Sequence, residues 1–146
     1  MVIGSAKDPL TMTVDAYCDA WRHYADFAGR TARIDYWRFF VINLVIEFCL
    51  GWLWHPLDFI YMLIVFVPVL ALTARRLHDT GRPTGWMILQ IAIMLLFVIG
   101  QLVLHVSPVL AIVLFALEIG LFIGLVILMA QSGQSQTNCW GEPPTR

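Results

Sequence analysis

Charged residues are scarce in this sequence: Asp, Glu, Lys and Arg together account for 13% of its 146 residues. A soluble domain of ordinary composition carries about a quarter. Hydrophobic residues make up 60% of the chain, and its mean hydropathy is +0.77. Most of the charges lie in the first 38 residues, around residues 75–82 and at the C-terminal end. This distribution is typical of a membrane protein, and the length suits one compact bundle rather than two domains.

Other absences argue against further classes of protein. The net charge is −1, so no surplus of positive charge indicates a nucleic-acid partner. The three cysteines, Cys18, Cys49 and Cys139, have no paired spacing, which argues against a disulfide framework or a Cys-based zinc site. No nucleophile elbow, Walker loop or HExxH motif is present, so we predict no catalytic residue, metal or cofactor. The first thirty residues contain no apolar run with a cleavage site, and we expect the first apolar helix to remain as an uncleaved anchor.

Four segments are long and apolar enough to cross a bilayer, which takes about 20 residues. They cover about residues 37–54, 57–74, 86–104 and 109–130. His55-Pro56 separates the first two segments and HVSP the last two, and proline at both sites predicts tight turns. The first two segments are short, so a single re-entrant unit is the alternative. We predict an all-α membrane protein, a four-transmembrane-helix bundle preceded by an amphipathic N-terminal helix.

The basic residues indicate the orientation of the bundle. Five of the nine Lys and Arg residues precede the first span, three lie between the second and third, and Arg146 ends the chain. Neither tight turn contains one. The positive-inside rule therefore predicts that both termini and the middle loop are cytoplasmic.

The residue pattern before the first span predicts the amphipathic helix. Thr13 is its expected N-cap, and Gly29 is its expected end. Apolar side chains recur at helical spacing from Val14 to Ala28. The opposite face carries Asp and Arg residues at three- and four-residue steps, which can pair along the helix. This helix can lie against the inner leaflet or the bundle. Its nearly balanced charge favours packing over electrostatic anchoring.

The stretch ALTARRLHDTGRPTGW, residues 71–86, places polar groups between two apolar runs. His78 and Asp79 are adjacent, so on a helix their side chains diverge by about 100° and form no direct catalytic dyad. Their spacing does not support a metal site shared with His23. Gly81 stands where a left-handed helix cap is expected. We favour the interpretation that the arginines stabilise a helix end through an arginine–carboxylate network. Alternatively they bind a phosphate, which the forked guanidinium of arginine suits.

Three stretches, FAGRTARIDYWRFF (27–40), ARRLHDTGRPTGW (74–86) and TNCWGEPP (137–144), resemble the DUF805 family of small bacterial inner-membrane proteins. The resemblance covers nearly the whole chain. The matching positions are Phe27, Gly29, Arg30, Arg33, Asp35, Tyr36 and Trp37, then residues 75–79, Gly81 and Arg82, and finally Asn138, Trp140, Gly141 and Pro144. The chain departs from the family's patterns at Pro83-Thr84, Cys139 and Trp140. The family is named for unknown function, so the resemblance implies a multi-pass protein of the bacterial inner (plasma) membrane and no substrate.

All three motifs fall on the predicted cytoplasmic side, so their polar residues can converge on one inner-surface cluster. Natural ion pairs in it are Arg33 with Asp79, or Arg75 with Asp35. We expect the cluster to be mainly structural, with binding of an anionic headgroup or phosphate as the second interpretation. Its predicted members are Arg30, Arg33, Asp35, Arg75, Arg76, His78, Asp79 and Asn138.

Polar residues inside the spans form a second group of candidates: Asn43, Glu47, Gln90, Gln101 and Glu118. No Lys or Arg lies at that depth, so we expect both glutamates to be protonated or hydrogen-bonded to the amides. They serve either a proton-coupled path or interhelical packing, and four short helices that enclose little volume favour packing. A GxxxG pattern at Gly120 and Gly124 could support dimerisation.

Three functions follow in order of preference. The first is a non-enzymatic membrane protein that binds or organises a partner at its cytoplasmic face. The second is a small proton-linked transporter that uses Glu47 and Glu118, and the third a lipid-modifying enzyme that uses His78 and Asp79. The expected partners are membrane lipids, a second copy of the chain or another membrane protein. We expect a flexible N-terminus over residues 1–12, a membrane domain over 13–130 and a cytoplasmic tail over 131–146.

Overall fold

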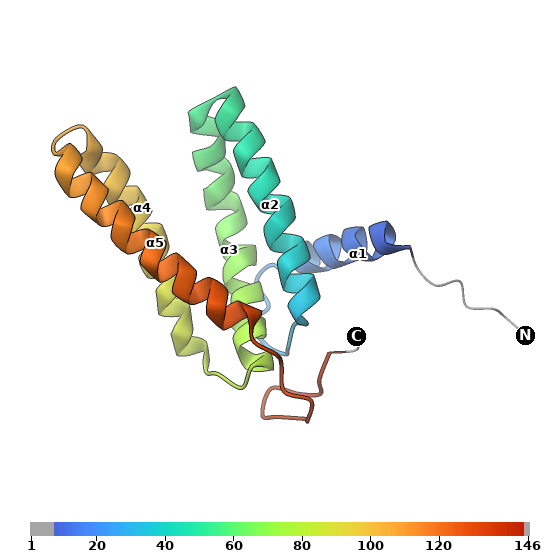
Figure 1. Ribbon diagram of the computed structural model, residues 1–146. Helices are drawn as coiled ribbons and strands as arrows, with labels where there is room; N and C mark the ends of the chain where they lie inside the picture. The colour runs from blue at the N-terminus through green and yellow to red at the C-terminus, as the bar shows by residue number, and fades with distance from the viewer. Residues whose placement is uncertain (1–7, 145–146) are drawn as a thin grey trace, which may run out of the picture.

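The computed structural model describes residues 8–144, and they form an all-helical chain (Figure 1). Within that range the only bridge between extended residues is an isolated pair, Asn138 and Gly141. The elements, in chain order, are α1 Pro9–Arg22, α2 Arg33–Leu53, α3 His55–Asp79, the 3₁₀ turn η1 Thr84–Met87, α4 Ile88–Leu104 and α5 Pro108–Ala130.

Four segments are long and apolar enough to cross a membrane: Arg33–Leu53, Pro56–Asp79, Thr84–Leu104 and Pro108–Ala130. The predicted four-helix architecture is therefore confirmed, and the first two spans are separate helices rather than one re-entrant unit. Large apolar side chains such as Phe48, Leu102 and Val109 point outward, with exposed fractions above 70%. An apolar exterior of this kind suits a lipid solvent, in which helices need not bury it.

The helices pair into two hairpins, α2–α3 and α4–α5 (Figure 1). Trp54, in an extended conformation, forms the whole of the first turn. Pro56 follows as the second residue of α3, in the first helical turn, where its missing N–H costs nothing. Ser107 caps α5 through its hydroxyl, and Pro108 follows it. Both tight turns are where the prolines predict them.

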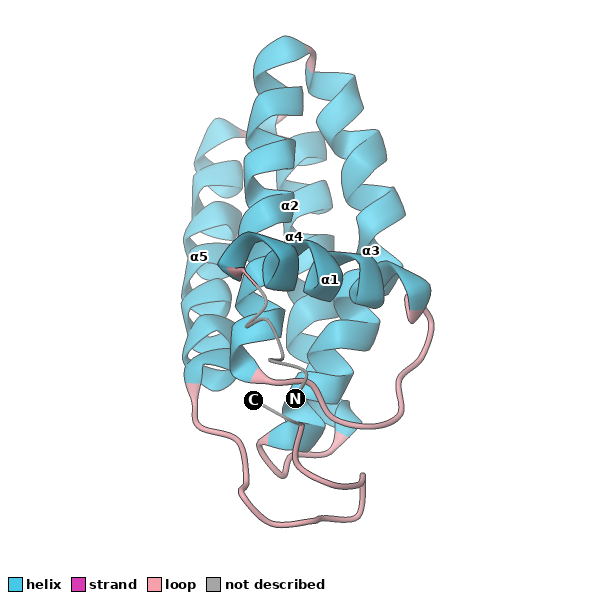
Figure 2. Ribbon diagram, turned by 90° about the vertical axis from the view of Figure 1, so that its right-hand side faces the viewer, coloured by secondary structure: helices cyan, strands magenta, loops and turns pink. Residues whose placement is uncertain are grey.

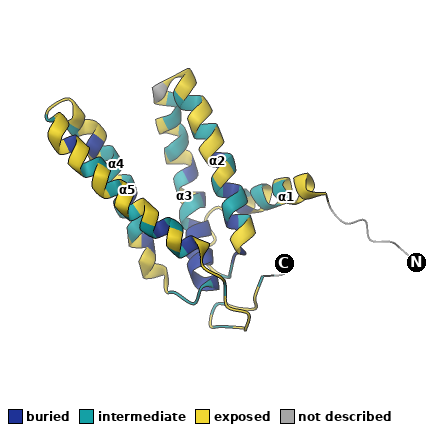
Figure 3. Ribbon diagram, viewed as in Figure 1, coloured by how far each residue is buried: buried dark blue, intermediate teal, exposed yellow. Residues whose placement is uncertain are grey.

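The hairpins lie apart at their turns and meet at the opposite end, where the chain buries its core (Figures 1 and 3). Phe39 of α2, Leu77 of α3 and Met129 of α5 are all at most 1% exposed there. We call this end, which contains residues 27–39, 71–87 and 129–144, the motif end. All three sequence motifs lie in it.

Helix α1 runs across α2 and α3 rather than along them (Figures 1 and 2). Tyr17 and Trp21 pack on Phe39, with ring centroids 5.2 and 6.3 Å from it. The packing face of the predicted amphipathic helix is thus confirmed at these positions, whereas Val14 is 52% exposed.

The bounds of α1 differ from those predicted. The helix begins at Pro9 rather than after Thr13, because proline at its first position fits there and the Thr13 hydroxyl bonds to the Pro9 carbonyl inside the helix. It ends at Arg22 rather than near Gly29, because Asp26 turns the chain by accepting a hydrogen bond from the Ala28 N–H. Of the predicted flexible segment 1–12, residues 9–12 are helical and residues 1–7 lie outside the described part of the chain.

Helix α3 continues to Asp79, beyond the predicted end of its span. Gly81 then adopts a left-handed conformation with φ of +78°, and the Arg82 N–H donates to the Leu77 carbonyl at 2.9 Å. This is the predicted glycine cap, which satisfies the last carbonyls of the helix. The long α3 therefore places Arg75, Arg76, His78 and Asp79 on its final two turns, at the point where the hairpins meet.

Candidate functional site: a buried arginine–aspartate cluster

Asp79, the last residue of α3, lies between two arginines. Its Oδ1 accepts from Arg30 Nε at 3.1 Å and from Arg30 Nη2 at 2.9 Å, and its Oδ2 accepts from Arg76 Nη1. The three side chains are 4%, 1% and 0% exposed, respectively for Asp79, Arg30 and Arg76. Buried charges need complete pairing, and here Arg30 Nε and Nη2 share one carboxylate oxygen while Arg76 takes the other. We call these three residues the clasp.

The remaining donors of the clasp bind backbone carbonyls of α5 and the tail. Arg30 Nη1 donates to the carbonyls of Gln136 at 2.8 Å and Gly141 at 3.2 Å. Arg76 Nε donates to Met129 O at 3.1 Å, at the end of α5 where carbonyls lack helical partners. Further bonds run from Arg30 to the Gln134 carbonyl and from Arg76 to the Gln131 carbonyl. The clasp therefore joins the loop before α2, the end of α3, the end of α5 and the tail.

The tail can approach Asp79 closely only because residue 133 is glycine. A Cβ at Gly133 would overlap the Asp79 carboxylate. The next residue, Gln134, donates its N–H to the Asp79 carbonyl at 2.8 Å. The predicted cytoplasmic tail is thus, in residues 131–144, a segment folded back over the end of α3 (Figure 1).

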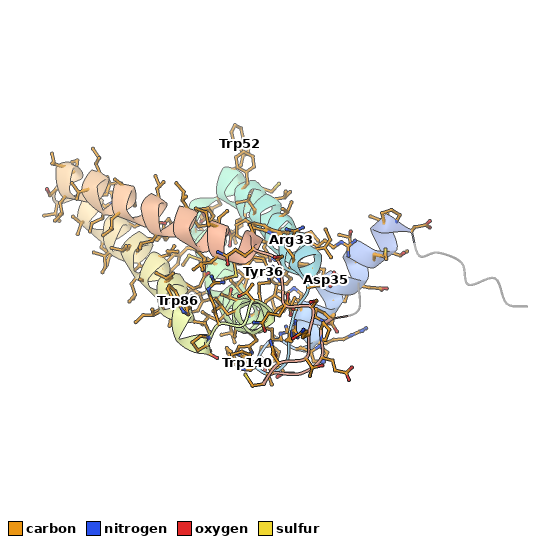
Figure 4. All side chains as sticks on the ribbon, turned by 60° about the horizontal axis from the view of Figure 1, so that its bottom comes forward. Arg33, Asp35, Tyr36, Trp52, Trp86 and Trp140 are labelled. Atoms are coloured by element: carbon orange, nitrogen blue, oxygen red, sulfur yellow. The ribbon has the colours of Figure 1, made fainter. Side chains whose placement is uncertain are left out.

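His78 is held on both nitrogens and on one ring face. Its Nδ1 donates to the Gly29 carbonyl at 3.1 Å, and its Nε2 lies 2.8 Å from the Thr84 hydroxyl. A carbonyl can only accept, so this pattern fits a neutral ring that accepts from Thr84 at Nε2. The indole of Trp140, which lies at the tail (Figure 4), stacks on the ring, with centroids 4.6 Å apart and planes at 7°. Thr84, the first residue of η1, thus bonds to this histidine through its hydroxyl.

Asn138 fastens the tail to the same place. Its Nδ2 donates to the His78 carbonyl at 3.0 Å and to Gln134 Oε1 at 2.9 Å. Its Oδ1 accepts the Trp140 N–H at 2.9 Å, which shapes the turn that presents the indole to His78. The amide of Asn138 is therefore a structural group of the tail.

Two of the predicted ion pairs are wrong. Asp79 pairs with Arg30 and Arg76 rather than with Arg33, and Arg33 instead donates to the Ala130 carbonyl at 3.2 Å. Asp35 pairs with Arg38 at 3.0 Å, one helical turn along α2, rather than with Arg75. The physical reason is geometric: the first turn of α2 directs Asp35 along its own helix, where Arg38 at i+3 is within reach.

Arg75 differs from the other arginines of the predicted cluster. It is 7% exposed, and its Nε and Nη2 atoms have no hydrogen-bond partner among residues 8–144. The carboxylates of Asp19 and Asp26 act on it electrostatically, but neither forms an ion pair with it in the described part of the chain. Buried guanidinium nitrogens without hydrogen bonds are costly, which distinguishes Arg75 from the fully paired Arg30 and Arg76.

Among the polar residues inside the spans, Asn43 is buried and hydrogen-bonded. Asn43 is 4% exposed, donates to the Phe39 carbonyl at 2.6 Å and accepts from the Tyr61 hydroxyl at 2.6 Å. Tyr61 also lies 3.4 Å from the Tyr17 hydroxyl of α1. Two residues absent from the sequence-based candidates thus complete a polar contact between α1, α2 and α3, and single tyrosines in apolar runs offer no signal that would identify them.

The two intramembrane glutamates do not come together. Glu47 belongs to α2 and lies near Asp58 and Tyr61 of α3, whereas Glu118 belongs to α5. No hydrogen bond of the described residues joins Glu47 to Asn43, or Glu118 to the α4 amides Gln90 and Gln101. The hydrogen bonds expected between the glutamates and these amides are therefore absent among residues 8–144.

Two hollows at the surface lie along the tail. One of about 230 Å³ is lined by Asp79, Gln134, Ser135, Pro143 and Pro144, and one of about 250 Å³ by residues 134–137. Neither reaches Glu47 or Glu118. Among residues 8–144, no three His, Cys, Asp or Glu side chains are placed to hold a metal ion.

The comparisons with known proteins agree with this architecture. Residues 24–142 match the family described as "Protein of unknown function (DUF805)". The chain is 41% identical over 80 residues to inner membrane protein YhaI of Escherichia coli (strain K12), an alignment that covers 50% of this chain and 68% of the relative. It is 37% identical over 87 residues to inner membrane protein YhaH of the same strain, with coverage of 52% and 72%. No solved structure matches the chain. The chain therefore belongs to the DUF805 family and is a multi-pass membrane protein related to inner membrane proteins of Escherichia coli.

Proposed function

We propose that this protein is a non-enzymatic phospholipid-binding protein of the inner membrane, in which the clasp is the frame and Arg75 binds the phosphate of a lipid headgroup. The observation that carries the proposal is the state of Arg75: nine-tenths buried, with two guanidinium nitrogens that have no hydrogen-bond partner among residues 8–144. A phosphate oxygen supplies both the charge and the acceptors that this group lacks.

The clasp suits a structural role because its hydrogen-bond donors and acceptors are already occupied. Both Asp79 oxygens accept from arginines, and the arginines donate to backbone carbonyls of α5 and the tail. Ligand binding by Arg30 or Arg76 would require the tail to leave. His78 likewise uses both ring nitrogens, so it offers no free base for a lipid-modifying reaction.

The position of Arg75 suits a headgroup. It lies four residues before the end of the span Pro56–Asp79, which is about 6 Å along a helix axis and therefore near the boundary of the hydrocarbon. The arginines of α1, α2 and the α3–α4 connection lie at or toward this same end, and both hairpin turns lack Lys and Arg. We accordingly propose that the motif end and both termini face the cytoplasm.

The test is native mass spectrometry of the protein released from lipid nanodiscs, with Arg75→Gln compared against Arg82→Gln. Hydrogen bonds to charged groups contribute about 1.5–3 kcal/mol, so Arg75→Gln should weaken retention of phospholipid roughly 10- to 100-fold. Arg82→Gln removes the same charge from the same end and should leave retention near that of the wild type. Equal lipid retention by all three proteins would refute the proposal.

A stability measurement separates lost binding from lost folding. The Nε and Nη2 atoms of Arg75 have no hydrogen-bond partner among residues 8–144 to lose, so Arg75→Met should raise the melting temperature of delipidated protein by removing a buried charge that no ion pair in that range compensates. Added phospholipid should then stabilise the wild type more than the variant, because a ligand stabilises only the state that binds it. A lower melting temperature for delipidated Arg75→Met would show that Arg75 has a structural partner in the protein.

A further inference from the structure

We propose that the headgroup bound at Arg75 is zwitterionic: the phosphate of a phosphoethanolamine group meets Arg75, and its primary ammonium meets Asp19 and Asp26. This inference rests on the proposed phospholipid-binding function and names the class of lipid. Its basis is a buried guanidinium whose Nε and Nη2 atoms have no hydrogen-bond partner among residues 8–144. Beside it are two carboxylates, on α1 and on the loop that follows, which act on it without forming an ion pair in that range.

The charges around Arg75 argue against a purely anionic headgroup. Asp19 lies in the last turn of α1 and Asp26 in the loop that follows it, and both act electrostatically on Arg75. An anion that approaches Arg75 therefore also approaches two negative charges and loses part of the attraction. A headgroup with one negative and one positive end can satisfy both kinds of protein charge at once.

The two carboxylates have room for a further donor. Asp26 Oδ1 accepts the Ala28 N–H at 2.9 Å, and Asp19 Oδ1 lies 3.2 Å from His23 Nδ1 in an exposed pair. An ionised carboxylate has about four acceptor positions, so each residue can accept an ammonium N–H without breaking its present contact. A primary ammonium has three N–H donors to distribute between them.

Helix α1 provides the surroundings that a lipid needs. It runs across α2 and α3, as a helix in the plane of a membrane interface does (Figures 1 and 2). Leu10 and Val14 on this helix are 74% and 52% exposed, which leaves apolar surface for acyl chains beside the charged groups. Tyr17 and Trp21 fasten the helix to Phe39, so Asp19 is carried on an ordered element.

This arrangement predicts a ranking of headgroups. Phosphatidylethanolamine offers a phosphate and N–H donors. Phosphatidylcholine has the same phosphate but a quaternary ammonium without an N–H, so it cannot donate to Asp19 or Asp26. Phosphatidylglycerol has the phosphate and no positive charge, so repulsion from the carboxylates is uncompensated. We expect retention in the order ethanolamine, then choline, then glycerol.

The experiment is a competition in nanodiscs that contain equal amounts of the three lipids, followed by native mass spectrometry. The wild type should retain phosphatidylethanolamine at least about fivefold over either other lipid, which corresponds to about 1 kcal/mol. The double variant Asp19→Asn/Asp26→Asn should lose this preference and still retain phospholipid through Arg75. Glu142→Gln, an exposed carboxylate of the tail, is the matched control and should keep the wild-type preference.

The outcomes separate this inference from the function on which it rests. Arg75→Gln with full lipid retention refutes phospholipid binding at Arg75. If Arg75→Gln loses lipid while the Asp19→Asn/Asp26→Asn protein keeps its ethanolamine preference, the proposed function stands and the zwitterionic site is refuted. A wild-type preference for phosphatidylglycerol also refutes the zwitterionic site. Asp19 and Asp26 are exposed, and Asn keeps the Oδ1 acceptor of Asp26, so their replacement should lower the melting temperature of delipidated protein by a few degrees at most.

A second arm distinguishes a membrane lipid from a soluble phosphate compound. Delipidated protein is heated with inorganic phosphate, with glycerophosphoethanolamine or with short-chain phosphatidylethanolamine. We expect the lipid to raise the melting temperature most, because only its chains can cover the apolar surface of α1. An equal rise with inorganic phosphate alone would refute both the zwitterionic headgroup and the membrane source.

Discussion

Replacement of Asp79 by Asn is the sharpest perturbation of the clasp, because it keeps the shape of the side chain and removes its charge. Arg30 and Arg76 are at most 1% exposed, so the variant leaves two buried cations without a counterion. Breaking a buried ion pair by removing one partner costs about 3–5 kcal/mol. Native stability is typically about 5–15 kcal/mol, so this loss is a large part of the total.

The assay is thermal unfolding in a fixed detergent, followed by limited proteolysis of the tail. For a chain of this size 1 kcal/mol shifts the melting temperature by about 2–4 °C, so Asp79→Asn should lower it on the order of 10 °C. The matched control is Asp35→Asn, which breaks the half-exposed pair with Arg38. Such exposed pairs contribute about 0.2–1 kcal/mol, and the control should therefore shift by a few degrees at most.

Proteolysis identifies where the stability is lost. Arg30 and Arg76 bind the carbonyls of residues 129–141, so loss of Asp79 should free the tail and speed cleavage there. Cleavage in the α2–α3 turn, far from the clasp, should keep its wild-type rate at low temperature. The reasoning is refuted if Asp79→Asn and Asp35→Asn lower the melting temperature equally, or if the tail of Asp79→Asn remains as protected as that of the wild type.

Three further substitutions test other contacts. Gly133→Ala should release the tail as Asp79→Asn does, because its Cβ overlaps the Asp79 carboxylate, and proteolysis that leaves the tail protected would contradict this. Tyr61→Phe removes the hydroxyl that donates to Asn43 at 2.6 Å and should cost about 1 kcal/mol of stability in detergent, as measured by thermal unfolding against wild type. Gly120→Ile should abolish dimers seen by cross-linking in membranes, since a Cβ at Gly120 meets open space within one chain, and an unchanged oligomeric state would remove the dimer interpretation.

The membrane spans could be predicted from the sequence because bilayer thickness sets the length of an apolar run. The ends of the helices were harder. Helix α3 extends past the apolar span to Asp79 because Arg76 and Asp79 are paired and buried under the tail, whereas a hydropathy window places the end of a span at such charges. Helix α1 begins at Pro9, because proline fits the first helical position, although elsewhere in a helix the same residue would be a break.

The composition of the site was predictable, and its pairing was not. Opposite charges in motifs on one side of the membrane indicated a cluster. Most acceptors of the clasp, however, are backbone carbonyls of Met129, Gln136 and Gly141, which carry no side-chain signal. Their positions depend on the close approach of Gly133 to Asp79, a contact between residues 54 positions apart that no local sequence pattern reveals. Charge complementarity alone therefore assigned Asp79 to the wrong arginine.

The adjacent arginines of ARRLHD show why one motif can hold two functions. Neighbouring side chains on a helix diverge by about 100°, so Arg75 and Arg76 cannot share one set of partners. Arg76 is directed to α5 and the tail, where Met129 and Asp79 satisfy it. Arg75 experiences instead the carboxylates of Asp19 and Asp26 on the α1 side, where no protein group in residues 8–144 satisfies its Nε and Nη2 atoms. The pair thus separates into an arginine that holds the fold together and an arginine that we propose binds a ligand, and replacing both at once would lose the fold before it reported on binding.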